Sequence, residues 1–413
     1  MPSRELSIQK SNTKSPNPPS IEALAAAALW AEGKSQVDIA AVLKKSQSAV
    51  SRLLRESAAH VKVRREFRWD DLDPQTAAAV RLKTSARGTS ERVAILAHSL
   101  GHKAPVVHAV PCGADTLGRG EQFEIFAAAA APIVRGLLEG VRGRVGVAWG
   151  STLWYLTQSL RAILPQKPIR SLAPIEFVPL CGDPLADSQE RYADRTSSRI
   201  VADLSRAVNG DSIQPPWLGL VPAFIPKDFD EAEAAVINRL IEMVPQYTAI
   251  FGPRTGKRGK GRQRQATDDL SMVLTAAGPS ERPLGFGENP LFGLTQSETT
   301  KLSSSIVGDI GGVLIPREAP IASSPRRKKQ SDTLVDQLTM RWTGLKLDHL
   351  KECAGMAATA NSPSRPGVTL ICFGSPRAEI VVEAIRRGLV NVLIIGSDLE
   401  AALDAHLPPL PIK

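Results

Sequence analysis

Five short apolar runs, each ending in glycine or followed closely by it, constrain the fold of this 413-residue chain more than any other feature. Helical patterns follow three of them, beginning near Leu153, Arg377 and Asp398. Strands that alternate with helices pair in parallel, because the chain must cross the sheet before the next strand can begin. The sequence therefore predicts an open, mainly parallel α/β sheet. The five runs are RVGVAW at 144–149, IEFVPL at 175–180, DLSMVLTAAG at 269–278, VTLICFG at 368–374 and VNVLIIG at 390–396.

The amino-terminal part differs from the rest of the chain in its composition and in the spacing of its apolar residues. Residues 1–20 are rich in Ser, Pro, Asn and Lys, so we expect a disordered arm there. Residues 21–68 hold three stretches with helical spacing of apolar residues, which predicts a small all-α domain. We expect a linker at 69–90 and the α/β domain at 91–413, interrupted by a basic surface loop at 253–268.

Composition excludes several classes of protein. The apolar content of 43% and charged content of 23% are ordinary for a soluble globular chain. The start of the chain has no apolar leader, and no stretch is long and apolar enough for a membrane helix, so we expect a cytoplasmic protein. The cysteines form no Cys-x-x-Cys pair, which argues against a disulfide framework and a cysteine zinc site. No metal or other cofactor is expected. The four cysteines are Cys112, Cys181, Cys353 and Cys372.

The net charge of +9 is concentrated in a few places. Residues 1–70 carry twelve Lys or Arg against seven Asp or Glu, a net +5. Two further basic blocks are PRTGKRGKGRQRQ at 253–265 and RRKK at 326–329. Basic excess around the helical domain suggests a phosphate-bearing partner, whereas the two later blocks are typical of solvated loops.

The stretch EGKSQVDIAAVLKKSQSAVSRLLRE, 32–56, fits a helix-turn-helix. Ser35 and Asp38 have the spacing of a capping box at the start of the first helix of the motif. With Val50, Leu53 and Leu54 facing inward, the second helix turns hydroxyl, amide and guanidinium groups outward, which is the composition that suits a DNA major groove. The residues expected to contact DNA are Ser35, Gln36, Ser46, Gln47, Ser48, Ser51, Arg52 and Arg55.

Lys44 and Lys45 depart from the usual helix-turn-helix pattern, in which glycine and then an apolar residue occupy the turn. A left-handed residue other than glycine costs roughly 1 kcal/mol, which a helical hairpin can tolerate. The alternative is a structural helix pair that contacts nothing. The outward face has no acidic residue before Glu56, which favours DNA binding.

Four motifs in a fixed order make the chain resemble the SorC-type sugar-binding transcriptional regulators of bacteria. The resemblance runs from about residue 21 to 404. It implies an effector domain with the fold of ribose-5-phosphate isomerase and CoA transferases, a phosphorylated sugar or similar metabolite as ligand, and commonly a tetramer on double-stranded operator DNA. The basic insertion, the RRKK loop and the two turn lysines depart from the family. The motifs are GKSQVDIAAVLKKSQSAVSRLL, VGVAWGSTL, IVGDIGG and FGSPRAEIVVEAIRRGLVNVLIIGSDLEAAL.

An effector is expected in the crevice beyond the carboxyl ends of the parallel strands. Gly150, Ser151 and Thr152 join a strand to a helix, where backbone N–H groups and hydroxyls can hold a phosphate, although the same residues would also serve as a plain helix cap. Arg377 could bind phosphate through two nitrogens or simply begin an exposed helix. Asp309 could hydrogen-bond a sugar hydroxyl or hold its own turn. The expected effector residues are Gly150, Ser151, Thr152, Gly182, Asp183, Gly278, Asp309, Gly374 and Arg377.

Two other classes of function remain as alternatives. A sugar-phosphate isomerase would need a carboxylate base beside a positive group, and lysines are scarce in the α/β part, with only Lys167 and Lys227 between 145 and 253. A recombinase would need a carboxylate metal triad or a nucleophilic serine, and no such arrangement is visible. His98 and His102 have metal-pair spacing but no further ligand motif nearby. We therefore expect no catalytic residues.

Overall fold

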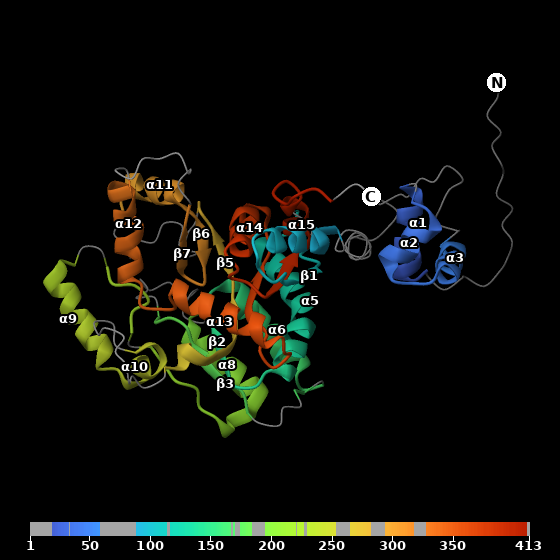
Figure 1. Cartoon of the computed structure of the whole chain (residues 1–413). Coiled ribbons are helices and arrows are strands. Elements are labelled where there is room, and N and C mark those ends of the chain that lie inside the picture. The colour runs from blue at the N-terminus through green and yellow to red at the C-terminus, as the bar shows by residue number, and fades with distance from the viewer. Residues whose placement is uncertain are drawn as a thin grey trace. The chain divides into compact units, whose positions relative to one another are not determined.

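The computed structural model divides the chain into two compact units, Met1–Thr84 and Ser85–Lys413 (Figure 1). We call them the helical unit and the α/β unit. The expected arm at 1–20 and linker at 69–90 lie almost wholly outside the described residues, as does 253–264 of the expected basic loop. The residues that the structure describes are 19–32, 34–57, 88–113, 116–166, 168–169, 174–183, 195–219, 221–226, 229–252, 265–281, 294–317 and 328–410.

The helical unit contains the three predicted helices. They are α1 (Ile21–Ala31), α2 (Gln36–Leu43) and α3 (Gln47–Glu56). Each begins after a serine whose side chain accepts a backbone N–H of the first turn, and the Ser35–Asp38 capping box is present. The small residues Ala26 and Ala40 let the helices pack around Leu29, Ile39 and Val50, which are essentially inaccessible to solvent.

The main sheet of the α/β unit confirms the predicted fold class. All of its pairings are parallel, in the order β1-β9-β8-β4-β2-β3. Every predicted run forms a strand, and most strand residues are buried because helices cover both faces. The strands are β1 (Val106–Val110), β2 (Arg144–Val147), β3 (Glu176–Pro179), β4 (Leu270–Thr275), β8 (Gly367–Cys372) and β9 (Val392–Gly396).

Two groups of helices enclose this sheet. α5 (Arg119–Gly140), α6 (Ser151–Ile163) and α8 (Ser197–Asn209) share one hydrophobic cluster with the strands. The helix at 88–99 shares the other cluster with five further helices. These are α9 (Glu231–Glu242), α10 (Pro245–Phe251), α13 (Leu347–Ala360), α14 (Ala378–Arg386) and α15 (Ser397–Leu403).

The predicted helix starts shift by one or two residues. The helix expected from Leu153 begins at Ser151, and the one expected from Asp398 begins at Ser397. Arg377 is not the first residue of an α-helix, because it closes the short 3₁₀ helix η8 (Ser375–Arg377), after which α14 begins at Ala378.

A second, antiparallel sheet was not predicted from the sequence. Its order is β5-β6-β7, formed by β5 (Ala277–Pro279), β6 (Ile306–Ile310) and β7 (Val313–Pro316). α11 (Gln296–Ser305) and α12 (Lys328–Arg341) accompany it, as Figure 1 shows. Only Ala276 separates β5 from β4, so the two strands read as a single apolar run in the sequence.

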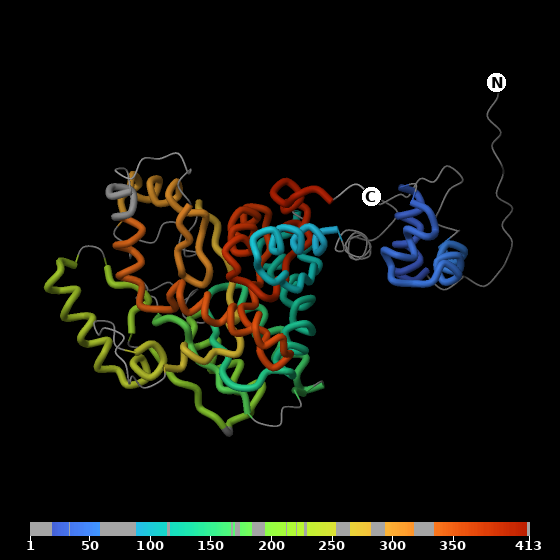
Figure 2. Tube along the Cα trace, viewed as in Figure 1, coloured from blue at the N-terminus to red at the C-terminus, as the bar shows by residue number. Residues whose placement is uncertain are grey.

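Both ends of the α/β unit meet at one edge of the main sheet (Figure 2). Among the residues that the structure describes, β1 pairs only with β9, and Arg92 of the helix at 88–99 donates hydrogen bonds to the backbone oxygens of Asp404, Leu407 and Pro408. No helix in the described part of the chain combines the length and the apolarity that crossing a bilayer requires.

Candidate functional site

The third helix of the helical unit carries an exposed polar and basic face. Val50 faces the core, while Ser48, Arg52 and Arg55 are exposed on the opposite side. The Arg55 guanidinium lies back on its own helix, where Nε donates to the Ser51 carbonyl oxygen over 3.4 Å. Arg52 makes no hydrogen bond or ion pair with any residue that the structure describes, so its guanidinium is available to a partner.

Three of the expected DNA-contacting serines have structural bonds: Ser35 and Ser46 cap helices, and Ser48 Oγ lies 3.0 Å from Ser46 Oγ. The Ser35 hydroxyl accepts the Asp38 N–H and the Ser46 hydroxyl accepts the Ala49 N–H, both over 3.2 Å. These serines therefore act first as helix caps. Gln47 is exposed, whereas Gln36 and Ser51 are half-buried.

The two lysines of the turn have distinct structural roles. Lys44 is the C-cap of α2 and adopts the left-handed conformation, with φ 52° and ψ 45°. Lys45 Nζ lies 3.0 Å from Glu22 Oε2 of α1, so an ion pair stands where the usual pattern has an apolar residue. The departure from glycine and an apolar anchor thus preserves the turn geometry of a helix-turn-helix.

In the α/β unit, the switch in strand order lies between β2 and β4. After β2 the chain moves to β3 at one edge, and after β4 it moves toward β8 and β9 on the other side. Open parallel sheets bind ligands beyond the carboxyl ends of the strands at such a point. The loops that begin at Gly150, after β2, and at Ala276, after β4, both lie at the carboxyl ends of these strands.

The Gly150–Thr152 loop has the geometry of an anion site. Gly150 has φ +109° and open space where a Cβ would stand, and α6 begins at the next residue. The first backbone N–H groups of α6 have no partner within the helix and carry its positive partial charge. Arg195 Nη1 donates to Ser151 Oγ over 2.8 Å, and the Gly150 N–H donates to the Arg195 carbonyl oxygen over 3.0 Å. We call these four residues, Gly150–Thr152 and Arg195, the anion seat.

Hydrogen bonds connect Asp183 to the segment that follows Arg195 of the anion seat. Its backbone pairs with Val221 and Ala223, and its carboxylate receives hydrogen bonds from Thr196 and Ser198, which follow Arg195. One carboxylate oxygen, Oδ1, is buried without a hydrogen-bond partner among the described residues. Burial raises the pKa of the Asp183 carboxyl above its usual value, and the two hydrogen bonds oppose this only in part. Gly182, just before it, packs against the Val221 carbonyl, so it shapes the loop by close approach.

Arg377 has structural partners at the end of β8. Its Nε donates to the Ala277 carbonyl oxygen and its Nη1 to the Phe373 carbonyl oxygen, each over 2.8 Å. It therefore joins β5 to the Gly374 loop instead of beginning an exposed helix. The Arg119 guanidinium lies 4.5 Å from the Phe373 ring centroid, and a Cβ on Gly374 would lie 2.7 Å from Arg377 Nη1 and 3.6 Å from Arg119 Nη2.

Asp309 and Gly278 pair directly across β5 and β6. Asp309 is buried, and its Oδ2 accepts the Gly312 N–H over 3.0 Å, so the carboxylate holds its own turn. That turn approaches the switch point closely, because a Cβ on Gly311 would lie 2.4 Å from Thr275 Oγ1 and 3.2 Å from Ala148 Cβ.

The expected effector residues thus lie near the carboxyl ends of the parallel strands, in three local sets. These sets are the Gly150–Thr152 loop with Asp183, the Gly374 loop with Arg377, and Gly278 with Asp309. Sequence reasoning missed Arg195 and Arg119. Arg195 reaches Ser151 from 44 residues along the chain, and no local spacing marks such a contact. Across the described residues, no group of three or more His, Cys, Asp or Glu side chains could hold a metal ion.

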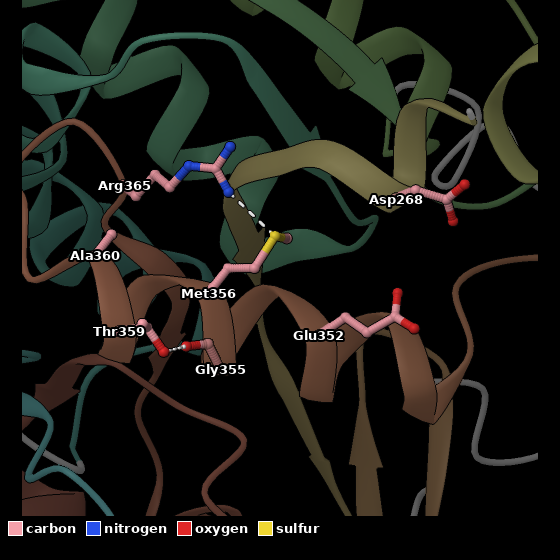
Figure 3. A pocket seen from close by; sticks show the side chains of 7 residues that line it. All are labelled: Asp268, Glu352, Gly355, Met356, Thr359, Ala360 and Arg365. Carbon is pink, nitrogen blue, oxygen red and sulfur yellow. Dashed lines mark hydrogen bonds between the residues drawn. The ribbon is translucent and has the colours of Figure 1, made fainter.

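An open hollow of about 670 Å³ lies away from these residues, along α13 (Figure 3). Arg365 and Asp268, which help to line it, precede β8 and β4, so the hollow opens at the amino ends of the strands. Arg365 Nη2 donates a hydrogen bond to Asp269 Oδ1 over 2.7 Å, so the arginine is already paired with a carboxylate. No expected effector residue lines this hollow, and the candidate effector site lies instead at the carboxyl ends of the strands, where the first N–H groups of α6 and the Arg195 guanidinium come together.

The arrangement of three short helices followed by an open parallel α/β unit is found in solved structures of bacterial proteins. The full-length sorbitol operon regulator SorC from Klebsiella pneumoniae matches with a TM-score of 0.50 and 16% identity, over 93% of this chain and 98% of that one. The resemblance drawn from the sequence motifs is therefore confirmed for the fold.

Two solved structures match a smaller part of the chain. A domain of a possible sugar-binding transcriptional regulator from Arthrobacter aurescens TC1 has a TM-score of 0.49 and 20% identity, over 77% of this chain and 96% of that one. A transcriptional regulator from Streptococcus pneumoniae TIGR4 has a TM-score of 0.49 and 15% identity, over 78% and 98%. No family profile matches the sequence, and no curated protein matches it.

Proposed function

We propose that the protein is a cytoplasmic, DNA-binding transcriptional regulator whose operator binding is controlled by a phosphorylated sugar or a related anionic metabolite. The observation that carries the proposal is the presence, in one chain, of an exposed basic α3 face and an anion seat at the switch point of a parallel sheet. The fold shared with the sorbitol operon regulator supports this combination.

The helical unit contributes the DNA contact. Arg52 offers a guanidinium with no partner among the described residues, and guanidinium groups read guanine edges through two hydrogen bonds. The exposed amide of Gln47 suits adenine, while Ser46 and Ser48 lie at the start of α3, where backbone and hydroxyl groups suit phosphates. The helix caps Ser35 and Ser46 fix the position of these groups.

The α/β unit contributes effector recognition. A phosphate at the anion seat would meet the N–H groups of Ser151 and Thr152 together with the Arg195 charge. Asp183, Gly278, Asp309 and Arg377 shape the surrounding loops through the bonds described above, so their role in our proposal is to position the effector site. No step of this mechanism requires a cofactor.

Control of DNA binding is a population shift between arrangements of an oligomer, which family resemblance suggests is a tetramer. An effector that binds one arrangement better than the other shifts the equilibrium by the difference in its binding free energies. The helix-turn-helix units then match or miss the spacing of the operator half-sites.

Fluorescence anisotropy tests the proposal with purified protein and the DNA upstream of its own gene, against scrambled DNA at near-physiological salt. We expect specific binding that changes with at least one sugar phosphate and not with its unphosphorylated parent. Genomic fragments can also be selected for binding to the protein. If no selected fragment binds more tightly than scrambled DNA, the proposal that the protein binds a specific operator is overturned. Consumption of a sugar phosphate during the assay would instead favour the isomerase-like alternative.

A further inference from the structure

A second cavity lies between the small antiparallel sheet and α12, apart from the anion seat. Its volume is about 180 Å³. Figure 1 shows α12 beside β6 and β7, the elements from which much of this cavity is built. The residues that line it are Phe224, Gly312, Val313, Leu314, Pro316, Val335, Asp336, Leu338, Thr339, Trp342, Leu345, Lys346 and Leu347.

Most of the wall of this cavity is apolar and buried, and the polar lining residues Asp336 and Thr339 are exposed. Leu338, Trp342 and Leu345 are at most 3% exposed, and Val335 and Leu314 are nearly as buried. The one lysine of the lining is already engaged, because Lys346 Nζ donates to the carbonyl oxygens of Thr339 and Trp342 at the end of α12. The indole N–H of Trp342 donates to the Leu345 carbonyl oxygen over 2.9 Å. The indole and ammonium donors of the wall are thus engaged within the protein, and the exposed Asp336 carboxylate, which also lines the cavity, would repel an anion.

We propose that this cavity is a second small-molecule site, which takes an uncharged single-ring compound. An apolar cavity of about 150 Å³ stays dry and binds benzene, so a volume of about 180 Å³ suits one six-membered ring with a small substituent. A sugar phosphate is disfavoured because the Asp336 carboxylate repels its charge and because the apolar part of the wall, Leu338, Trp342 and Leu345 among it, offers its hydroxyls no side-chain partner for the water they lose. The ligand class therefore differs from that proposed for the anion seat.

The cavity borders the loops of the effector site through a single side chain. The Trp342 ring packs against the Trp149 ring, with 5.7 Å between centroids, and Trp149 immediately precedes Gly150. The same ring fills the space beside Gly312, where a Cβ would lie 2.1 Å from Trp342 Cζ2. A ring bound in the cavity would contact Trp342 directly and so lie one side chain away from the anion seat.

Isothermal titration calorimetry of the full chain with toluene tests this site without DNA or sugar phosphate. Failure here is therefore distinguishable from failure of the proposed regulator function. We expect one toluene per chain. Leu338→Phe fills the cavity from within and should weaken toluene binding at least about tenfold. Leu334→Phe is the matched control, since Leu334 lies on the same helix but does not line the cavity, and it should keep the wild-type affinity.

The outcomes separate clearly. No binding heat up to the solubility limit of toluene, together with no saturation-transfer NMR signal from toluene to the protein, would overturn the proposal. Equal loss of affinity in Leu338→Phe and Leu334→Phe would also overturn it, because the effect would not depend on the cavity. If Leu338→Phe does not fold, Val335→Leu adds one methylene to the same wall and should weaken binding in the same direction.

Discussion

Arg195 Nη1 donates a hydrogen bond to Ser151 Oγ, and the Arg195 carbonyl oxygen accepts the Gly150 N–H. The loop before α8 is thereby fastened to the first turn of α6 at two points. This arrangement brings a guanidinium to a helix N-terminus that already favours negative charge. The anion seat is thus assembled from two separate parts of the chain, and Arg195 is the residue whose removal tests it most directly.

Arg195→Met should weaken binding of a phosphorylated effector by roughly tenfold or more, because a charge-assisted hydrogen bond is lost while the length of the side chain is kept. Calorimetry with the sugar phosphate that answers the anisotropy screen measures the effect. Arg199→Met is the matched control, since Arg199 is an exposed arginine of α8 that pairs with Asp203. Equal affinities of the two variants would show that Arg195 does not hold the anion.

Arg52→Ala should weaken specific operator binding by roughly 1–3 kcal/mol if the guanidinium contacts a guanine edge. Binding to scrambled DNA should fall much less, and the response to effector should persist. Arg239→Ala removes an exposed arginine from α9 of the α/β unit and serves as control in the same anisotropy assay. An Arg52→Ala variant with wild-type operator affinity would mean that α3 is wrongly placed as the reading helix.

Lys44→Gly should stabilise the helical unit by up to about 1 kcal/mol, because glycine adopts the left-handed conformation of this C-cap without a Cβ clash. Thermal unfolding followed by circular dichroism measures the change. Lys44→Ala removes the same charge but keeps the clash, so it should show no such gain. If alanine stabilised the unit as much as glycine, removal of charge and not backbone geometry would be the cause.

The buried carboxyl of Asp183 makes the free energy of unfolding depend on pH. Burial raises the pKa of this carboxyl in the folded chain above its ordinary value, so the unfolded chain loses this proton first when the pH is raised. The contribution of Asp183 to the free energy of unfolding therefore falls as the pH rises from the unfolded pKa through the folded one. Asp183→Asn removes this loss.

Urea unfolding between about pH 4 and about pH 7 compares the two chains across that window. The free energy of unfolding of Asp183→Asn, relative to wild type, should increase with pH. A difference that stays constant over the range would contradict the raised pKa. Glu231→Gln, at an exposed carboxyl of α9, controls for loss of a charge.

Much of the fold follows from local patterns in the sequence. Apolar runs such as Val392–Gly396 predict buried parallel strands because both of their faces must be covered. Ser35 and Asp38 predict a helix start because their spacing satisfies two backbone N–H groups. The left-handed turn at Lys44 also follows, since the helix-turn-helix spacing requires it whatever residue stands there.

What the sequence does not reveal depends on long-range packing. β1 is short, carries a histidine and is only partly buried at the sheet edge, so its pattern is weak. β5 merges with β4 in the sequence. The sequence fits Arg377 equally well as a phosphate ligand or as a helix start, and only the positions of the Ala277 and Phe373 carbonyl oxygens show that it joins β5 to the Gly374 loop.

The pairing of β1 with β9 bears on how the chain is made. β1 precedes every other described strand of the main sheet in the chain, yet its neighbour among them is β9, which comes last. Nearly the whole α/β unit must therefore leave the ribosome before β1 can pair with β9. Until then β1 is an unpaired strand whose backbone N–H and C=O groups are exposed. Nascent chains stalled before β9 should need chaperone protection at this strand, whereas β2 and β3, adjacent in both sequence and sheet, can pair early.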